Sequence, residues 1–109
     1  MEFSEYQKQS RKTAIYPKIG FSYVYPAFGL AGETGEVLEK IKKIFRDKNG
    51  IIDQETKESL EKEFGDILWY ISNLCHELNI DLNEVAEKNL KKLFDRQKRE
   101  MLHGSGDNR

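Results

Sequence analysis

The stretch that decides the fold is GLAGETGEVLEKIKKIF, residues 29–45, in which apolar side chains recur with the period of an α-helix. Val37 and Ile41 belong to the resulting apolar stripe, while Glu33 and Glu36 lie at its edge. Three glycines interrupt the same stretch, and each glycine inside a helix costs about 1 kcal/mol relative to alanine. The acidic pair beside a core stripe and the weak helix formers both need an explanation.

The same pattern recurs 30 residues further along the chain, in SLEKEFGDILWYISNLC, residues 59–75. Glu63 takes the position of Glu33, and Asp66 takes that of Glu36. At about 100° per residue, the new acids lie at the edge of a second apolar stripe, which consists of Leu60, Phe64, Ile67, Ile71, Leu74 and Leu78. Two antiparallel helices that pack through these stripes would bring four carboxylates together.

Four carboxylates at one place repel one another, and they stay ionised only where a cation lies among them. Oxygen ligands without a histidine or a thiolate favour Mg²⁺ or Mn²⁺. The alternative is that each acidic pair belongs to a solvated helix face, which is the usual case for a single pair. A ferritin-like di-iron site would need Glu-x-x-His, and here Asn73 stands three residues before His76.

Helical periodicity dominates the rest of the chain, and we expect an all-α, mostly antiparallel bundle of about four helices. The expected helices span Ser4–Ala14, Ala27–Asp47, the residues after Asp53 to Leu78, and Leu82–Met101. Gly50 ends the second helix, and the capping box DLNE, residues 81–84, begins the fourth. Residues 1–109 would form a single domain, in which the polar residues 103–109 are a flexible tail.

Self-association is expected from two features of the sequence. Gly35 and Gly65 would lie on the backs of their helices, where a small surface suits the close packing of another helix, for example from a second subunit. A chain of 109 residues with apolar residues on more than one helix face is a reasonable candidate for an oligomer.

Composition limits the compartment and the partners. Charged residues make up 34% of the chain but nearly cancel to a net charge of −1, so no basic surface indicates nucleic-acid binding. Cys75 is the single cysteine, which excludes an internal disulfide and favours a reducing compartment. No apolar run approaches the ~18 residues of a membrane span, and the N-terminus lacks a signal-peptide core. We therefore expect a cytoplasmic protein with no nucleic-acid or membrane partner.

GETGE followed by EFGDILWYI resembles the MazG-like, all-α nucleoside triphosphate pyrophosphohydrolases. The metal motif of that family, E-x-x-E and then E-x-x-D on the next long helix, maps onto Glu33, Glu36, Glu63 and Asp66. The fuller form of the motif has a doubled acid before each pair. Gly32 and Lys62 stand at those positions here, so any role of the extra acids is absent.

The resemblance implies Mg²⁺-dependent hydrolysis of a nucleoside triphosphate between the α and β phosphates, by a homodimer or a homotetramer. The four acids would hold the metal, and Glu36 or Glu33 would accept a proton from the attacking water. Lys40 could pair with Glu36 or reach a phosphate. On the last helix, the resemblance implies phosphate contacts from Lys88, Asn89, Lys92 and Arg96, of which the three basic residues are spaced by four.

Tyr70 lies on the same side of its helix as the second acidic pair and is the candidate for stacking on the base, whereas Trp69 points nearer the back face and could serve an interface. Aromatic residues at such positions are more often core than ligand contacts. Two alternatives stay open. One is a related pyrophosphohydrolase acting on another substrate, such as phosphoribosyl-ATP, and the other is a non-enzymatic helical module whose acids are surface residues.

Overall fold

The computed structural model describes all 109 residues and contains helices but no strands. Its elements are α1 (Phe3–Ser10), the 3₁₀ turn η1 (Arg11–Thr13), α2 (Val24–Lys48), α3 (Gln54–Glu77) and α4 (Leu82–Lys98). The predicted all-α class with four helices is therefore confirmed. None of these helices combines the length and the apolar character that a membrane span requires.

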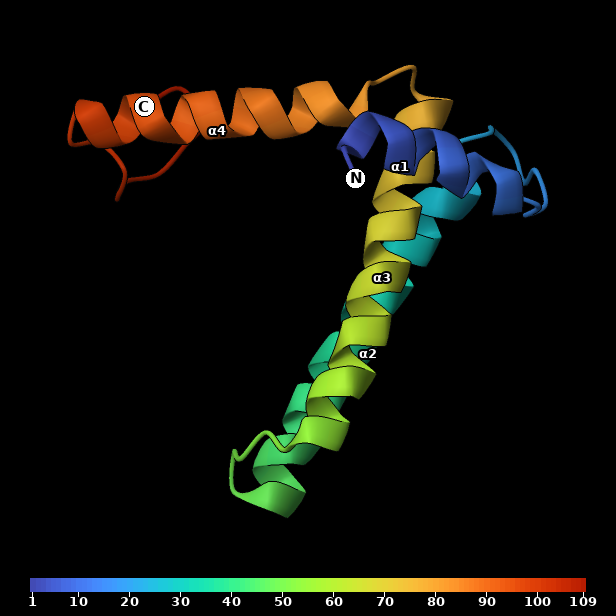
Figure 1. Ribbon diagram of the computed structural model, residues 1–109, viewed down its shortest axis with the longest axis vertical. Helices are drawn as coiled ribbons and strands as arrows, with labels where there is room; N and C mark the ends of the chain where they lie inside the picture. Colours follow the sequence, from blue (N-terminus) through green and yellow to red (C-terminus); the bar gives the residue numbers. More distant parts are fainter.

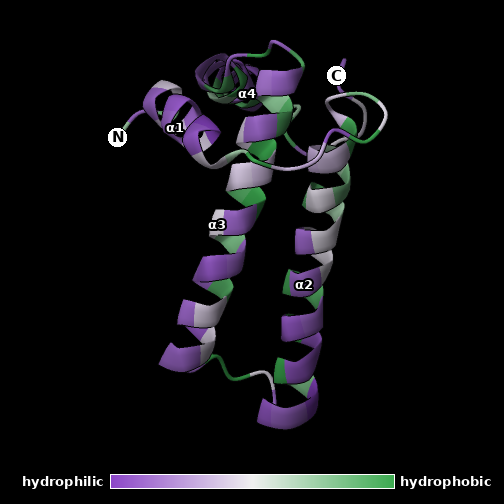
Figure 2. Cartoon of the chain, turned by 90° about the vertical axis from the view of Figure 1, so that its right-hand side faces the viewer, coloured by the Kyte–Doolittle hydropathy of each residue, from purple (hydrophilic) through white to green (hydrophobic).

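Helices α2 and α3 lie side by side and antiparallel, and together they form the hairpin of the fold (Figures 1 and 2). Their buried contact consists of Val37 and Ile44 from α2 and Leu60 from α3, and the half-buried Ile41 and Ile67 pack against these three. All five belong to the two apolar stripes of the repeated sequence. The hairpin is thus the structure that the repeat predicts.

A short connection joins the two helices of the hairpin. Asn49 ends α2 in the left-handed region, with φ of 53°, and Gly50 follows with φ of 76°, a conformation in which glycine carries no steric cost. Asp53 then caps α3 by accepting a hydrogen bond of 2.8 Å from the amide of Thr56. These signals reverse the chain within a few residues and set the antiparallel pairing.

The observed helices differ from the expected ones at several points: α1 stops at Ser10 and passes into η1 instead of continuing to Ala14, and α4 stops at Lys98 instead of Met101. Helix α2 begins at Val24 instead of Ala27, because Pro26 falls in the first turn, where the missing amide hydrogen has no partner to lose. Phe64 and Leu78, which were expected in the core stripe of α3, are 53% and 46% exposed. Each lies on the stripe by periodicity, but no helix of the same chain covers it.

Helix α1 crosses one end of α3 and is held there largely by polar contacts (Figure 2). The hydroxyls of Ser10 and Ser72 lie 2.7 Å apart in a hydrogen bond, and Ser72 is fully buried. The side chain of Gln7 donates to the carbonyl of Ile80 at 2.8 Å and accepts from the amide of Leu82 at 2.9 Å. Through Gln7, α1 thus fixes the turn from which α4 starts.

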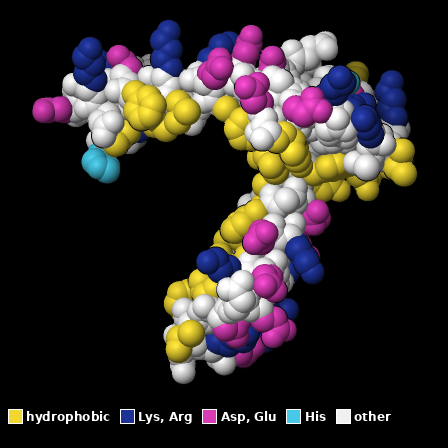
Figure 3. Space-filling model, viewed as in Figure 1, with side chains coloured by type: hydrophobic (Ala, Val, Ile, Leu, Met, Phe, Trp, Pro, Cys, Tyr) yellow, Lys and Arg dark blue, Asp and Glu magenta, His cyan; other side chains and the backbone are white.

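Helix α4 projects away from the hairpin as an arm (Figure 1). Asp81 caps its first turn by accepting from the amides of Asn83 and Glu84, and contacts with α1 and the end of α3 hold its base. The antiparallel packing within one chain is therefore that of α2 and α3. Apolar side chains gather along the inner side of the angle between the arm and the hairpin, where they remain uncovered (Figure 3).

Candidate metal centre

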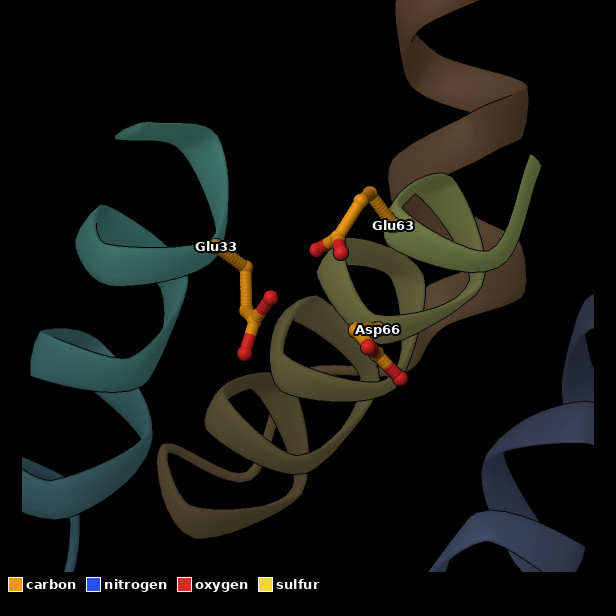
Figure 4. A group of neighbouring side chains, drawn as sticks. All are labelled: Glu33, Glu63 and Asp66. Atoms are coloured by element: carbon orange, nitrogen blue, oxygen red, sulfur yellow. The ribbon is translucent and has the colours of Figure 1, made fainter. Parts of the chain in front are cut away.

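Three of the four predicted acids meet between α2 and α3. Glu33 reaches from α2 toward α3, which carries Glu63 and Asp66 (Figure 4). One carboxylate oxygen from each residue lies within 4.8 Å of the other two. Glu33 and Glu63 are half-buried, whereas Asp66 is exposed. We refer to these three residues as the acidic cluster.

Glu36 does not belong to the acidic cluster. Its side chain is exposed, and its carboxylate is not among the oxygens that converge within 4.8 Å, although Glu36 follows Glu33 by the same three residues that separate Glu63 from Asp66. Its charge is still felt at Glu33, where it is one of the causes of a raised pKa. The structure therefore separates the four predicted acids into a converging group of three and one solvent-facing neighbour.

Lys40 pairs with the acidic cluster, and not with Glu36. Its ammonium lies 2.9 Å from Oε1 of Glu63 and donates to the hydroxyl of Ser59 at 2.7 Å. The other carboxylate oxygen of Glu63, Oε2, is buried and has no hydrogen-bond partner. One oxygen of Glu63 is thus neutralised by the lysine, and the other lacks the partner that a buried acceptor requires.

The pKa values of the two glutamates in the cluster shift in opposite directions. The pKa of Glu33 is raised, chiefly because its carboxyl group can share a proton with Glu63, and further by burial and by the charge of Asp66. The pKa of Glu63 is lowered, chiefly by the hydrogen bond from Lys40. A cation at the cluster would relieve the repulsion that raises the pKa of Glu33.

The donor set of the acidic cluster fits a hard divalent cation. It offers carboxylate oxygens from two helices, one of them buried and unpartnered, and it contains no nitrogen or sulfur ligand. Mg²⁺ and Mn²⁺ prefer such oxygen ligands. Glu33, Glu63 and Asp66 could therefore hold a metal ion of this type.

Tyr70 lies beside the acidic cluster, as predicted from its position on α3. Its pKa is raised, first by burial and then by the nearby Tyr25, Glu33 and Asp66. The backbone of Gly29 on α2 approaches the ring so closely that a Cβ atom there would lie 2.1 Å from Cε1 of Tyr70. This contact explains why α2 carries a glycine at position 29.

An aromatic group continues from Tyr70 toward the start of the chain. Tyr70 meets Trp69 edge to face at 5.1 Å between ring centroids, Trp69 meets Tyr16 at 6.0 Å, and Tyr16 stacks on Tyr25 at 5.4 Å. Trp69 also donates to the hydroxyl of Thr13 at 2.8 Å, so its indole packs within the chain. Tyr16 could not be predicted as part of this group, because it lies in the non-periodic segment between η1 and α2.

The predicted phosphate-binding residues lie on the arm. Lys88 has an 80% exposed side chain and lies 3.7 Å from Glu84, and Asn89 is exposed. Lys92 pairs with Asp107 at 3.3 Å, and Arg96, only 3% exposed, donates to the Asp107 carbonyl at 2.7 Å. Because α4 projects away from the hairpin (Figure 1), a single chain does not bring these residues to the acidic cluster.

The C-terminal residues fold back along α4. The guanidinium of Arg109 donates to the carbonyls of Met101, Leu102 and Gly106, and Arg99 donates to the carbonyl of Arg109 at 2.7 Å. These contacts give residues 103–109 a defined path in the structure, while the flexibility expected of them stays a prediction.

The model of the MazG nucleotide pyrophosphohydrolase domain matches residues 27–101, which extend from the first turn of α2 to just beyond α4. This chain belongs to the MazG family. The match confirms the family resemblance carried by the two acidic motifs. The Gene 37 protein of Mycobacterium phage L5 is 44% identical over 116 residues, and the alignment covers the whole of both chains. No solved structure matches the chain.

Proposed function

We propose that this MazG-family protein hydrolyses a nucleoside triphosphate between its α and β phosphates, with Mg²⁺ as the cofactor, and releases a nucleoside monophosphate and pyrophosphate. The observation that carries the proposal is the convergence of three carboxylates from α2 and α3 within 4.8 Å, at the positions of the repeated acidic motif. The two alternatives are a pyrophosphohydrolase that acts on another substrate, such as phosphoribosyl-ATP, and a helical module without enzymatic activity. The experiment below distinguishes them.

Glu33, Glu63 and Asp66 would hold the metal in this proposal. A bound Mg²⁺ neutralises charge on the triphosphate and lowers the pKa of a water molecule. Glu36 is exposed and lies outside the group of ligands, so it is free to accept the proton as that water attacks the α-phosphate. Glu33 is the alternative base, because it belongs to the acidic cluster and the neighbouring acids raise its pKa.

Tyr70 would provide a stacking surface for the base. It lies next to Glu33 and Asp66, and the other rings of the aromatic group support it from behind. A base stacked on an aromatic ring gains about 1–3 kcal/mol in complexes with single-stranded nucleic acids, and the same contact is available to a free nucleotide.

A second copy of the chain would complete the site. The accessible surface is 8319 Å², whereas a folded monomer of this mass exposes about 6,300 Å². The radius of gyration is 16.9 Å, against about 13 Å for a compact domain of this length. The excess of roughly 2,000 Å² per chain exceeds the ~800 Å² per partner of a standard interface, and supports a homodimer or homotetramer.

The same copy would supply the basic residues that the arm holds away from its own hairpin. In this arrangement the apolar inner side of one arm packs on the hairpin of the partner. Lys88, Asn89 and Lys92 of one chain would then bind the pyrophosphate part of a triphosphate held by the acids of the other. Arg96 is 3% exposed and donates to the Asp107 carbonyl, so it would join them only after it loses that contact. A cytoplasmic location and the absence of nucleic-acid and membrane partners stay predictions from composition.

The proposal is tested by pyrophosphate release from a panel of ribo- and deoxyribonucleoside triphosphates, with and without Mg²⁺. Wild type should release pyrophosphate only with the metal, and Asp66→Asn should lose about 10³-fold in kcat/KM, since it removes a ligand of the metal that stabilises the transition-state charge. Glu36→Gln should lose about 10²-fold if Glu36 is the base. Lys43→Gln, an exposed change on the same helix, serves as the control.

Each alternative has its own result. Release of orthophosphate would place the cleavage elsewhere on the triphosphate and contradict the proposed reaction. Turnover of phosphoribosyl-ATP without turnover of any triphosphate would keep the chemistry and change the substrate. An absence of turnover, together with no change in melting temperature on addition of Mg²⁺, would leave the helical interaction module.

A further inference from the structure

Lys40 is the single basic side chain in an ion pair with the acidic cluster. Its ammonium lies 2.9 Å from Oε1 of Glu63, whereas Glu33 and Asp66 form no ion pair within the chain. The pair joins the two helices of the hairpin, since Lys40 belongs to α2 and Glu63 to α3. Three carboxylates are thus balanced by one lysine.

Lys40 has a second anchor that does not depend on the acids. It donates to the hydroxyl of Ser59 at 2.7 Å and to the Ser59 carbonyl at 3.4 Å. With Glu63, these contacts match the three hydrogens of an ammonium group. Lys40 could therefore lose Glu63 to another cation and still remain bound to α3 through Ser59.

We propose that Lys40 is a resident counter-cation of the acidic cluster, which stabilises the cluster when no metal is bound and competes with a divalent cation for Glu63. This inference rests on the proposed function, because it takes the acidic cluster as the metal site. The geometry supports it in two ways: the ammonium occupies one oxygen of Glu63, and the buried second oxygen of the same residue has no partner.

Competition between Lys40 and a metal ion predicts the direction in which metal affinity changes when the lysine charge is removed, whereas a purely structural role predicts no change. A unit positive charge about 6 Å from a divalent ion opposes binding by an amount equivalent to roughly tenfold in affinity, even at the dielectric constant of water, and salt reduces this effect. Removal of the charge should therefore tighten metal binding. It should also destabilise the metal-free hairpin, because the repulsion among the carboxylates is no longer offset.

The test measures Mn²⁺ binding to the full chain by calorimetry, without substrate, and melting in EDTA. Lys40→Met should bind Mn²⁺ roughly three- to tenfold more tightly than wild type and should melt at a lower temperature in EDTA. Lys40→Arg keeps the charge and should bind Mn²⁺ like wild type. Lys43→Met is the matched control, because it makes the same change in net charge on the same helix at an exposed residue outside any ion pair.

Three outcomes would overturn the inference. Weaker Mn²⁺ binding by Lys40→Met would mean that Lys40 orients Glu63 for the metal, and unchanged binding would mean that the contact only ties the helices together. Equal tightening by Lys43→Met would reduce the effect to net charge. In each case wild type still binds Mn²⁺ and the proposed metal site stands, whereas an absence of Mn²⁺ binding by wild type would remove both proposals together.

Discussion

The hairpin and the arm are both built from amphipathic helices, yet only in the hairpin does a neighbouring helix of the same chain bury part of the apolar face. In the hairpin, Val37, Ile44 and Leu60 are at most 9% exposed. On the arm, Leu90 and Phe94 are 52% and 62% exposed, although they recur with the same helical spacing. Amphipathic periodicity thus specifies which face of a helix must be buried, but it does not specify what buries it.

The two regions also differ in how they use charge. The hairpin draws three carboxylates together at the expense of mutual repulsion, whereas the basic residues of the arm are paired with acidic residues or backbone carbonyls nearby. A group of like charges held in place by packing indicates a ligand. The predictions below test whether the two regions form one site across two chains, and how substitutions in the hairpin change its free energy of unfolding.

Subunit mixing has the largest expected effect. Asp66→Asn removes a proposed metal ligand from the hairpin, and this variant alone should lose about 10³-fold in pyrophosphohydrolase activity. Lys92→Gln removes a proposed phosphate contact from the arm, and this variant alone should lose about 10–100-fold. If the arm of one chain completes the hairpin of another, one site of the mixed dimer carries both wild-type residues. Co-refolded variants should then recover about one quarter of wild-type activity, by random pairing in a two-fold dimer.

The control for mixing is the double variant, which carries both substitutions in one chain. Co-refolding it with either single variant should give no more pyrophosphohydrolase activity than the two separate variants show. Recovery that stays at the level of the separate variants would show that the arm and the hairpin of the same chain work together. A Lys92→Gln variant as active as wild type would mean that the arm has no part in the reaction. A gel-filtration profile of each sample checks that mixed oligomers have formed.

The sequence predicted the hairpin well because its information is local and repeated. Two stripes in the same register, an N-cap at Asp53 and a glycine stop at Gly50 define two antiparallel helices, and the acids at equivalent positions follow from the register. It was less accurate for Glu36, because the rotation of α2 about its own axis brings Glu33 to the cluster and leaves Glu36 exposed, whereas both acids of α3 take part. That rotation depends on side-chain packing across the interface and not on periodicity.

The direction of the arm and the contacts of Tyr16 could not be predicted. Helical period places the phosphate-binding candidates on one face of α4, but the turn from which α4 leaves the hairpin is held by non-local hydrogen bonds that Gln7 donates to Ile80 and accepts from Leu82. Tyr16 reaches the aromatic group through a segment with no regular structure. Long-range polar contacts of this kind leave no periodic trace in a sequence.

A charge on the exposed face of the arm should separate the subunits. Phe94→Asp replaces a 62% exposed ring and would place a carboxylate in the proposed apolar interface. We expect it to weaken association by 100-fold or more, about 3 kcal/mol. Phe94→Leu keeps an apolar side chain at the same position and should leave association nearly unchanged. Sedimentation velocity over a range of concentrations distinguishes the two, and equal association of Phe94→Asp and wild type would contradict the proposed interface.

Substitution of a glycine by alanine should have opposite effects on the free energy of unfolding at a packed position and at an open position of the hairpin. Gly29→Ala places a Cβ atom 2.1 Å from Tyr70, so we expect a loss of about 1–3 kcal/mol in the free energy of unfolding. Gly35→Ala meets nothing within 4 Å and should gain up to about 1 kcal/mol from helix propensity. Urea denaturation measures both. A loss of stability or of association in Gly35→Ala would instead place a second chain against the back of α2.

The smallest expected effect concerns the proton at Glu33. Because the folded state raises its pKa, the folded state binds this proton more tightly than the unfolded state, and the contribution of Glu33 to stability is lost as pH rises through the raised value. Glu33→Gln removes that charge, so in EDTA at pH 7 it should be more stable than wild type by about 0.5–1 kcal/mol after solvent screening. The difference should shrink as the pH falls toward 4.5.

Added Mg²⁺ should reverse this order, because it stabilises only the chain that keeps its ligand. Glu36→Gln, an exposed change outside the acidic cluster, should leave the melting temperature nearly unchanged at both pH values. A Glu33→Gln variant that is less stable than wild type at pH 7 in EDTA would mean that Glu33 supports the hairpin. It would follow that repulsion among the carboxylates does not destabilise the metal-free fold at Glu33.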